Sequence, residues 1–208
     1  MDHLQQLIER YPVLVPVAGD IKAAFDVIAE SFAGGGKLLI AGNGGSAADA
    51  EHIVGELMKN FVKNRAMPGA FAAALAEADS GMAEYLIPRL QPGLPAMALS
   101  AHASLNTATL NDIDGDIVFA QQVYGYGREG DAFLGISTSG NAKNVLCAAV
   151  VARAKNMKVV ALTGGNGGRL AGLADVSIVV PETETYKIQE LHLPVYHCLC
   201  MMLEDRFF

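Results

Sequence analysis

The stretch that decides the fold is KLLIA (residues 37–41) followed by GNGGS (residues 42–46). Its first half is a short, continuous apolar run, which is typical of a strand that is buried on both faces of a sheet. Its second half is a glycine-rich turn, and residues 47–58 after it have helical periodicity. The stretch therefore predicts a strand, a tight turn and a helix, which is the repeating unit of a parallel sheet.

The same alternation of apolar strand and helix continues through the chain. Helical periodicity also precedes the stretch, and the last residues form a long helix that ends near Asp205. We therefore expect an α/β fold in one domain over residues 1–208. It is a three-layer sandwich with a five-stranded parallel sheet flanked by helices, and with long N- and C-terminal helices. The four further strands are expected at residues 95–99, 132–136, 158–162 and 176–180.

One segment, residues 66–94, does not fit this alternation. It is rich in alanine, carries scattered acidic side chains and ends in a proline-rich exit. A segment of this length is too long for an unstructured loop inside a compact domain, so we expect it to have its own structure, an additional amphipathic helix.

Composition and charge exclude several classes of protein. The chain has 208 residues, of which 51% are hydrophobic, and its net charge is −7. It is too apolar to be disordered, and its apolar runs are too short to span a membrane. With no block of Lys or Arg, nucleic acid and anionic membranes are poor candidates as partners. Without a signal peptide at its start, and with three cysteines that suit reduced thiols, the chain is expected to be cytoplasmic.

Two loops at expected strand ends could bind a phosphate group. Residues 42–46 and residues 137–141 each place small or hydroxyl side chains before a helix, where free backbone amides and the helix dipole attract anions. Both loops could equally be ordinary helix caps. A dinucleotide site is disfavoured, because Ala47 stands where the third glycine would be, and the chain contains no Gly-Lys-Ser/Thr motif for a nucleotide triphosphate.

A second group of polar residues could bind a metal ion. His52 and Glu56 are four residues apart and therefore share one helix face, while Gln189, His192 and His197 lie on the expected last helix. Pro194 should kink that helix. Nitrogen and oxygen ligands of this kind suit a metal site with an open position. The spacing alone equally fits a surface contact between His52 and Glu56.

Four runs of sequence resemble one known family. They are AGNGGSAADAEHIVGE (residues 41–56), GISTSGN (135–141), LTG (162–164) and KIQELH (187–192) continuing to His197. Together they resemble the bacterial phosphoheptose isomerases of the sugar isomerase (SIS) superfamily. The resemblance covers nearly the whole chain except residues 66–94, which would be an insertion into a single SIS domain.

The resemblance implies a zinc-dependent aldose–ketose isomerase. Such an enzyme converts sedoheptulose 7-phosphate to D-glycero-D-manno-heptose 7-phosphate through an enediol, as a homotetramer with its sites between subunits, in lipopolysaccharide heptose synthesis. One zinc ion per subunit would be held by His52, Glu56, Gln189 and His197, and Glu56 and His197 would be the catalytic base and acid. Substrate contacts would fall on Asn43, Gly44, Gly45, Ser46, Asn111, Asp112, Ser137, Thr138, Ser139 and Gln189.

Two alternative functions remain open within the same superfamily. The insertion at residues 66–94 raises the possibility of another ketose phosphate as substrate. A non-catalytic, sugar-phosphate-binding regulatory protein is the other alternative, although the full set of His, Glu and Gln residues favours an enzyme. Ala142 also replaces a serine that usually contacts phosphate in the family, which removes one hydroxyl donor worth about 1 kcal/mol.

Overall fold

A five-stranded parallel sheet forms the centre of the molecule, in a computed structural model that describes residues 2–208. The order of the strands is β2-β1-β3-β4-β5, and neighbouring strands are parallel throughout. This confirms the predicted α/β fold. The strands are β1 (Leu38–Ala41), β2 (Ala96–Ala98), β3 (Ala132–Ile136), β4 (Lys158–Thr163) and β5 (Val176–Val179).

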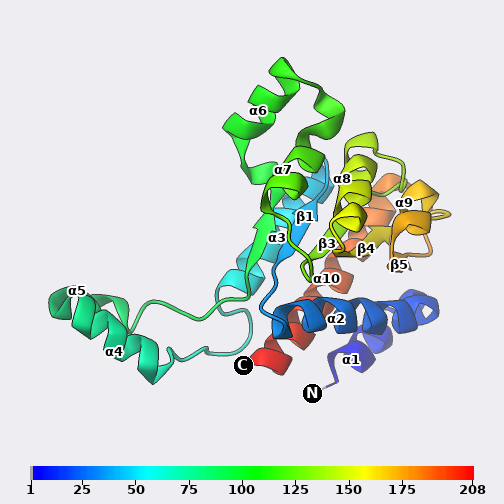
Figure 1. Ribbon diagram of the computed structural model, residues 1–208. Coiled ribbons are helices and arrows are strands. Elements are labelled where there is room, and N and C mark those ends of the chain that lie inside the picture. Colours follow the sequence, from blue (N-terminus) through cyan, green and yellow to red (C-terminus); the bar gives the residue numbers. More distant parts are fainter. Residues whose placement is uncertain (1) are drawn as a thin grey trace.

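Helices cover both faces of the sheet (Figure 1). Alternate strand residues face opposite layers, so Leu38 and Ile40 join one apolar core while Leu39 and Ala41 join the other. The first core includes side chains of α1 (His3–Arg10), η1 (Pro12–Val17), α2 (Ala18–Ala33), α3 (Gly45–Met58) and α10 (Thr185–Phe207). The second includes side chains of η2 (Leu99–Ala101), α7 (Val118–Tyr126), α8 (Lys143–Ala154) and α9 (Gly168–Leu173).

The strand order places a topological switch point between β1 and β3. The chain leaves β1 towards β2 on one side, then returns to place β3 on the other side of β1. Ligands of open parallel sheets bind at the carboxyl ends of the strands at such a point. The two polar loops, residues 42–46 and 137–141, follow these two strands and therefore lie at this edge.

The last helix, α10, is the longest helix of the described residues and continues through Pro194. A proline at this position removes the hydrogen bond to the carbonyl of Glu190. The length of α10 does not make it a membrane segment: no helix within residues 2–208 is both long and apolar enough to cross a bilayer. Burial raises the pKa of the Cys198 thiol on this helix to about 12, and all three cysteines are free, with Cys147 only half-buried.

Residues 66–94, called the arm below, extend away from the sheet (Figure 1). The arm contains two helices, α4 (Gly69–Ala78) and α5 (Ser80–Leu86), rather than the single helix that we expected. Asp79 separates them because its backbone is extended and its side chain caps α5 by accepting a hydrogen bond from the Met82 N–H. Within these two helices only Ala83 is buried, so the arm packs chiefly against itself.

The base of the arm is held by a buried ion pair. The Nε atom of Arg65 donates to Glu204 Oε1 at 2.9 Å, and both side chains are almost fully buried. The same guanidinium donates to three backbone carbonyls, at Glu56, Leu57 and Pro92. The Glu204 carboxylate also accepts hydrogen bonds from the N–H groups of residues 61, 62 and 63. Arg65 and Glu204 therefore connect the start and the end of the arm to α3 and α10.

Candidate active site

An open cavity of about 320 Å³ lies at the carboxyl end of β1, beside the switch point. One wall comes from the turn after β1 and the first residues of α3. The opposite wall comes from α8 and from the segment around α6 (Ala103–Asp112) and η3 (Gly115–Ile117). The volume is at the small end of the range that ligand sites occupy. The lining residues are Gly42, Asn43, Gly44, Ala47, Ser100, Asn106, Thr107, Leu110, Gly115, Val118, Phe119 and Asn144.

Paired amide hydrogen bonds hold the turn after β1 in place. Asn43 and Asn144 exchange two hydrogen bonds, each 2.9 Å long, which join this turn to α8. Gly44 and Gly45 then begin α3. A Cβ at Gly45 would lie 2.5 Å from Nε2 of Gln189 on α10, so a side chain there would push the glutamine amide away. The glycine therefore allows Gln189 to approach the N-terminus of α3, and Ser46 is buried in the first turn of that helix.

The second predicted loop, residues 137–141, lies just before α8. Ser137 is buried, Thr138 is half-buried, and Ser139 is exposed, with its Oγ accepting a hydrogen bond from the Asn141 N–H at 3.2 Å. Gly140 has φ +63°, and a Cβ there would lie 1.9 Å from the Gly167 carbonyl oxygen. Only glycine fits this contact, which fixes the loop against the turn after β4. The loop thus presents hydroxyl groups and a helix N-terminus at the same edge of the sheet as residues 42–46.

A contact between a histidine and a carboxylate lies farther along α3. His52 Nε2 is 3.0 Å from Glu56 Oε1, and Lys59 Nζ is 3.2 Å from Glu56 Oε2. The Glu56 side chain is 13% exposed, while that of His52 is 42% exposed. The carboxylate is thus partly shielded from water but still reachable, which suits a group that exchanges protons with a substrate.

His197, on α10, lies next to this pair. The ring centroids of His52 and His197 are 4.9 Å apart, and those of Phe61 and His197 are 5.5 Å apart. Its Nε2 atom is buried without a hydrogen-bond partner among the described residues. Burial lowers the pKa of His197 and the neighbouring His52 lowers it further, while Glu56 opposes the shift. The neutral imidazole is therefore favoured.

The structure adds two residues that the sequence analysis did not select. Tyr196 is 1% exposed, and its hydroxyl lies 3.0 Å from Nδ1 of His52. Asp49 lies one turn before His52 on α3; burial raises the pKa of its carboxyl, and its Oδ2 is buried without a hydrogen-bond partner among the described residues. The spacing of Asp49 and His52 was a usable signal, because residues three apart share a helix face. Nothing in the sequence pairs Tyr196 with α3.

The predicted zinc ligands are only partly assembled. His52, Glu56 and His197 lie together, whereas Gln189 lies against Gly45, two turns before His197 on α10. No group of three or more His, Cys, Asp or Glu in residues 2–208 already has the arrangement of a metal centre. The donor set nevertheless fits zinc, because two imidazoles and a carboxylate are common zinc ligands and the orphaned Nε2 of His197 needs a partner.

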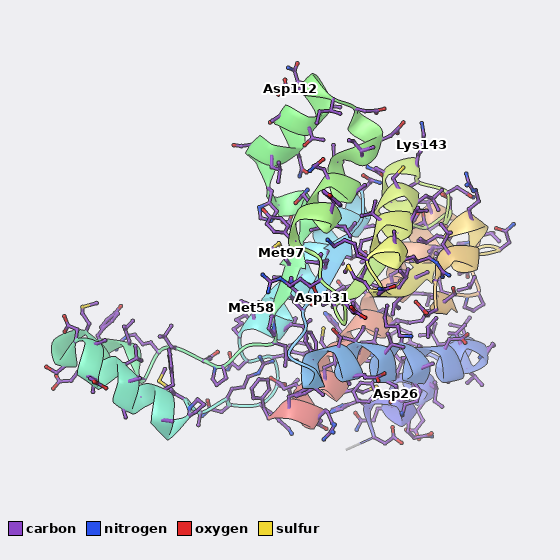
Figure 2. The ribbon with its side chains drawn as sticks, in the orientation of Figure 1. Asp26, Met58, Met97, Asp112, Asp131 and Lys143 are labelled. Carbon is purple, nitrogen blue, oxygen red and sulfur yellow. The ribbon has the colours of Figure 1, made fainter. Side chains whose placement is uncertain are left out.

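Of the predicted site residues, only Asn43 and Gly44 line the cavity itself. Asn111 and Asp112 hydrogen-bond to each other at the exposed end of α6. Figure 2 places Asp112 at the outer tip of the molecule, far from Met58 at the end of α3. His192 is fully buried and its Nε2 bonds to the Thr163 carbonyl, which agrees with a structural role.

Comparisons with known proteins agree on one family. The model of the SIS domain family matches residues 4–86 and 72–164. The phosphoheptose isomerase of Rhodospirillum rubrum is 40% identical over 185 residues, which cover 89% of this chain and 85% of that protein. Among solved structures, the phosphoheptose isomerase from Francisella tularensis is similar with a TM-score of 0.76 and 33% identity, over 97% of this chain and 92% of the other. The phosphoheptose isomerase from Neisseria gonorrhoeae is similar with a TM-score of 0.74 and 33% identity, over 97% of this chain and 91% of the other.

Proposed function

Because the chain belongs to the phosphoheptose isomerase family of SIS-domain proteins, we propose that it converts sedoheptulose 7-phosphate to D-glycero-D-manno-heptose 7-phosphate. The general class, a sugar-phosphate isomerase, follows from relatives of this identity over most of the chain. The observation that supports the specific reaction is the gathering of His52, Glu56 and His197, in a chain whose phosphate-type loops lie at the switch point.

The reaction needs one base and one acid. Moving the carbonyl group of a ketose from C2 to C1 requires that a proton leave C1 and that a proton be added at C2, with an enediol between the two steps. Glu56 is a suitable base, because its carboxylate is largely shielded from water and held by His52 and Lys59. We assign the acid to His197, which lies beside His52 and whose ring nitrogen could give a proton to the sugar oxygens and take it back.

The phosphate group of the substrate would be bound by the two loops at the switch point. Ser46, Ser137, Thr138 and Ser139 offer hydroxyl groups beside the N-termini of α3 and α8, which favour negative charge. Asn43, Gly44 and Gly45 would contact the sugar from the turn after β1. Glu56 then has to reach C1 from the next turns of α3, so the sugar chain would extend along that helix.

We also propose one zinc ion per subunit, held by His52, Glu56, Gln189 and His197. When bound, zinc would polarise the carbonyl and hydroxyl oxygens of the substrate. Gln189 would have to turn from Gly45 towards the other three residues, or the ion would use those three and leave an open position. Metal analysis of the purified protein, with zinc removed and restored, tests this proposal.

The proposed assembly is a cytoplasmic homotetramer with its sites between subunits. The position of Asn111 and Asp112 supports this, because both are exposed at the end of α6, and Figure 2 places Asp112 at the outer tip of the molecule. A second copy would be needed to bring them to a site. Light scattering should give a mass four times that of the 21.8 kDa chain.

The decisive experiment is proton NMR of sedoheptulose 7-phosphate incubated with zinc-loaded protein. New anomeric signals of an aldose would establish the proposed reaction. Their absence, with bound zinc confirmed, would favour another ketose phosphate selected with help from the arm. A protein that binds sugar phosphates but converts none of them would instead be a regulatory member of the superfamily.

A further inference from the structure

One exposed ion pair joins two elements that line the candidate cavity. Lys143 Nζ donates to Asp116 Oδ2 at 2.5 Å, which connects the start of α8 to η3. The sequence neighbours of these two residues, Asn144 and Gly115, both line the cavity at the carboxyl end of β1. The ion pair therefore lies at the rim of this cavity, at the end of α8 where Figure 2 labels Lys143.

The two proposed phosphate loops bring no positive charge of their own. Residues 42–46 and 137–141 contain neither Lys nor Arg. A phosphate monoester carries about 1.5 to 2 negative charges at pH 7. Backbone amides and a helix dipole attract such a group, but they carry only partial charges. A cation within reach of residues 137–141 would therefore strengthen the binding of the phosphate group.

Lys143 lies within reach because it is the first residue of α8. The hydrogen-bond ladder of this helix begins with the bond from the Leu146 N–H to the Ala142 carbonyl. The N–H groups of Lys143 and Asn144 precede that bond, at the position where a helix N-terminus binds anions. The flexible stem of Lys143 can turn its ammonium group from Asp116 to an anion that these amides hold.

We propose that Lys143 supplies the positive charge of the phosphate site and that Asp116 competes with the substrate phosphate for it. This inference rests on the sugar-phosphate function proposed above and assigns a charged side chain to the phosphate group. The exchange of partners costs little, because the side chains of Lys143 and Asp116 are 71% and 39% exposed and exposed ion pairs are weak. The hydrogen bond to Asp116 raises the pKa of Lys143, so the side chain is cationic at neutral pH.

Two substitutions in the pair should change phosphate binding in opposite directions. Lys143→Met removes the cation, so the dissociation constant for phosphate should rise by about two- to fivefold. Asp116→Asn removes the competing carboxylate, so the same constant should fall by a similar factor. Titration calorimetry measures both, with inorganic phosphate and with sorbitol 6-phosphate, which has no carbonyl group and cannot be isomerised.

The ion pair of Lys22 and Asp26 on α2 provides the matched control. Its side chains are also exposed, at 51% and 55%, and Asp26 lies far from Lys143 in Figure 2. Lys22→Met and Asp26→Asn make the same changes of net charge, so both should leave phosphate binding unchanged. Lys143→Arg keeps the local charge and should bind phosphate as the unchanged protein does.

Turnover gives a second readout, which a purely structural ion pair would not move in this way. Lys143 would contact the phosphate group and not the reacting carbons. For Lys143→Met the KM for sedoheptulose 7-phosphate should therefore rise by the same factor, with no loss in kcat. Added sodium chloride should reduce the difference between the variants, because salt screens exposed charges.

The outcomes separate this inference from the proposed function. Equal phosphate affinities of Lys143→Met and the unchanged protein would overturn the inference. Weaker binding in both Lys143→Met and Asp116→Asn would also overturn it, since the pair would then act by holding α8 against η3. The proposed function fails in a different way: the protein converts no sedoheptulose 7-phosphate, while calorimetry still shows the two opposite shifts.

Discussion

Glu56 has two proposed roles, as a zinc ligand and as the catalytic base. Its carboxylate contacts His52 and Lys59, and its backbone carbonyl accepts a hydrogen bond from Arg65. A carboxylate that is fully engaged as a metal ligand cannot at the same time remove a proton. The two proposed roles of Glu56 must therefore alternate during turnover, or the base must be the oxygen that faces away from the metal.

Replacing Glu56 with Gln should lower turnover by about 10²- to 10⁴-fold, because the amide cannot accept the C1 proton. The amide can still contact His52 and Lys59, so the thermal unfolding temperature should change little. The rate is measured by NMR with sedoheptulose 7-phosphate. Glu51→Gln, an exposed position on the same helix, is the control and should keep the activity. An active Glu56→Gln protein would remove Glu56 from the role of base.

His192 gives the protein a predictable sensitivity to acid. Burial lowers its pKa to about 4, and the hydrogen bond to the Thr163 carbonyl offsets only part of this shift. In the unfolded chain the pKa is about 6.5. Between about pH 6.5 and pH 4 the unfolded chain binds a proton at His192 that the folded protein does not. The free energy of unfolding is therefore unaffected by His192 above about pH 6.5, and it falls by up to about 3 kcal/mol as the pH drops towards 4.

The variant His192→Gln checks this, because its amide can still donate to Thr163 but does not titrate. Urea unfolding at pH 7.5 and 4.5 should show a smaller loss of stability for the variant, by about 2 kcal/mol. Equal losses in both proteins would show that other groups, such as the buried carboxylates, account for the acid sensitivity.

For single residues, the sequence predicts which side chains belong to the site better than it predicts which side chains they contact. The spacing of His52 and Glu56 predicts their contact, because residues four apart on a helix meet. The contact of His52 with Tyr196 joins residues 144 positions apart, so no local pattern contains it. The positions of Gln189 beside Gly45, and of Asn111 away from the cavity, likewise depend on how whole helices pack.

Among the secondary structure elements, the junction of α3, α10 and the arm depends on Arg65 and Glu204. Their side chains are 0% and 1% exposed, and each makes several hydrogen bonds to the backbone. Removing one member of a buried ion pair leaves the other charge without compensation. This junction also contacts Glu56 directly, because Arg65 donates a hydrogen bond to the backbone carbonyl of Glu56.

Arg65→Met should therefore lower the free energy of unfolding by about 3–5 kcal/mol, measured by urea denaturation. The double variant Arg65→Met/Glu204→Gln should recover part of this loss, since it removes the unpaired charge while the amide oxygen can still accept from the backbone N–H groups of residues 61–63. Lys22→Met is the control: it breaks an exposed pair with Asp26 and should cost less than about 1 kcal/mol. A small effect of Arg65→Met would mean that water replaces the guanidinium.

Elements with a clear local pattern were predicted well. All five strands lie where the short apolar runs predict them, because a strand buried on both faces has to be continuously apolar. The arm was harder, since its alanine-rich sequence suits a helix almost throughout. The break between the two helices comes from one extended residue, Asp79, which caps the second helix. The helix propensity averaged over the whole segment does not reveal a break at a single residue.

For the whole molecule, the arm and the sheet are separable in structure. Residues 66–94 contribute one buried side chain from their two helices, while both cores of the sheet lie outside them apart from Leu94. The arm does expose large apolar side chains, including Phe71, Met82 and Tyr85. What the arm contacts in an assembly is a property of several chains, which explains why one sequence predicts its presence but not its purpose.

Replacing residues 69–88 with a short Gly-Ser linker should leave the domain folded. The thermal unfolding temperature should fall by less than about 5 °C, because Arg65 and Pro92 stay in place. Light scattering and the NMR assay on the same protein then show whether the arm serves assembly or catalysis. An unfolded protein would mean that the arm stabilises the fold through contacts that a single chain does not make.

The clamp at the base of the arm has a consequence for how this chain can evolve. Arg65 binds the backbone just before the arm begins and the carbonyl of Pro92 where it returns, so both ends are attached at one place. The two matches to the SIS domain family, residues 4–86 and 72–164, overlap within the arm. A segment joined to its host at a single point can be gained, lengthened or lost while the surrounding lineage keeps its sheet and its chemistry.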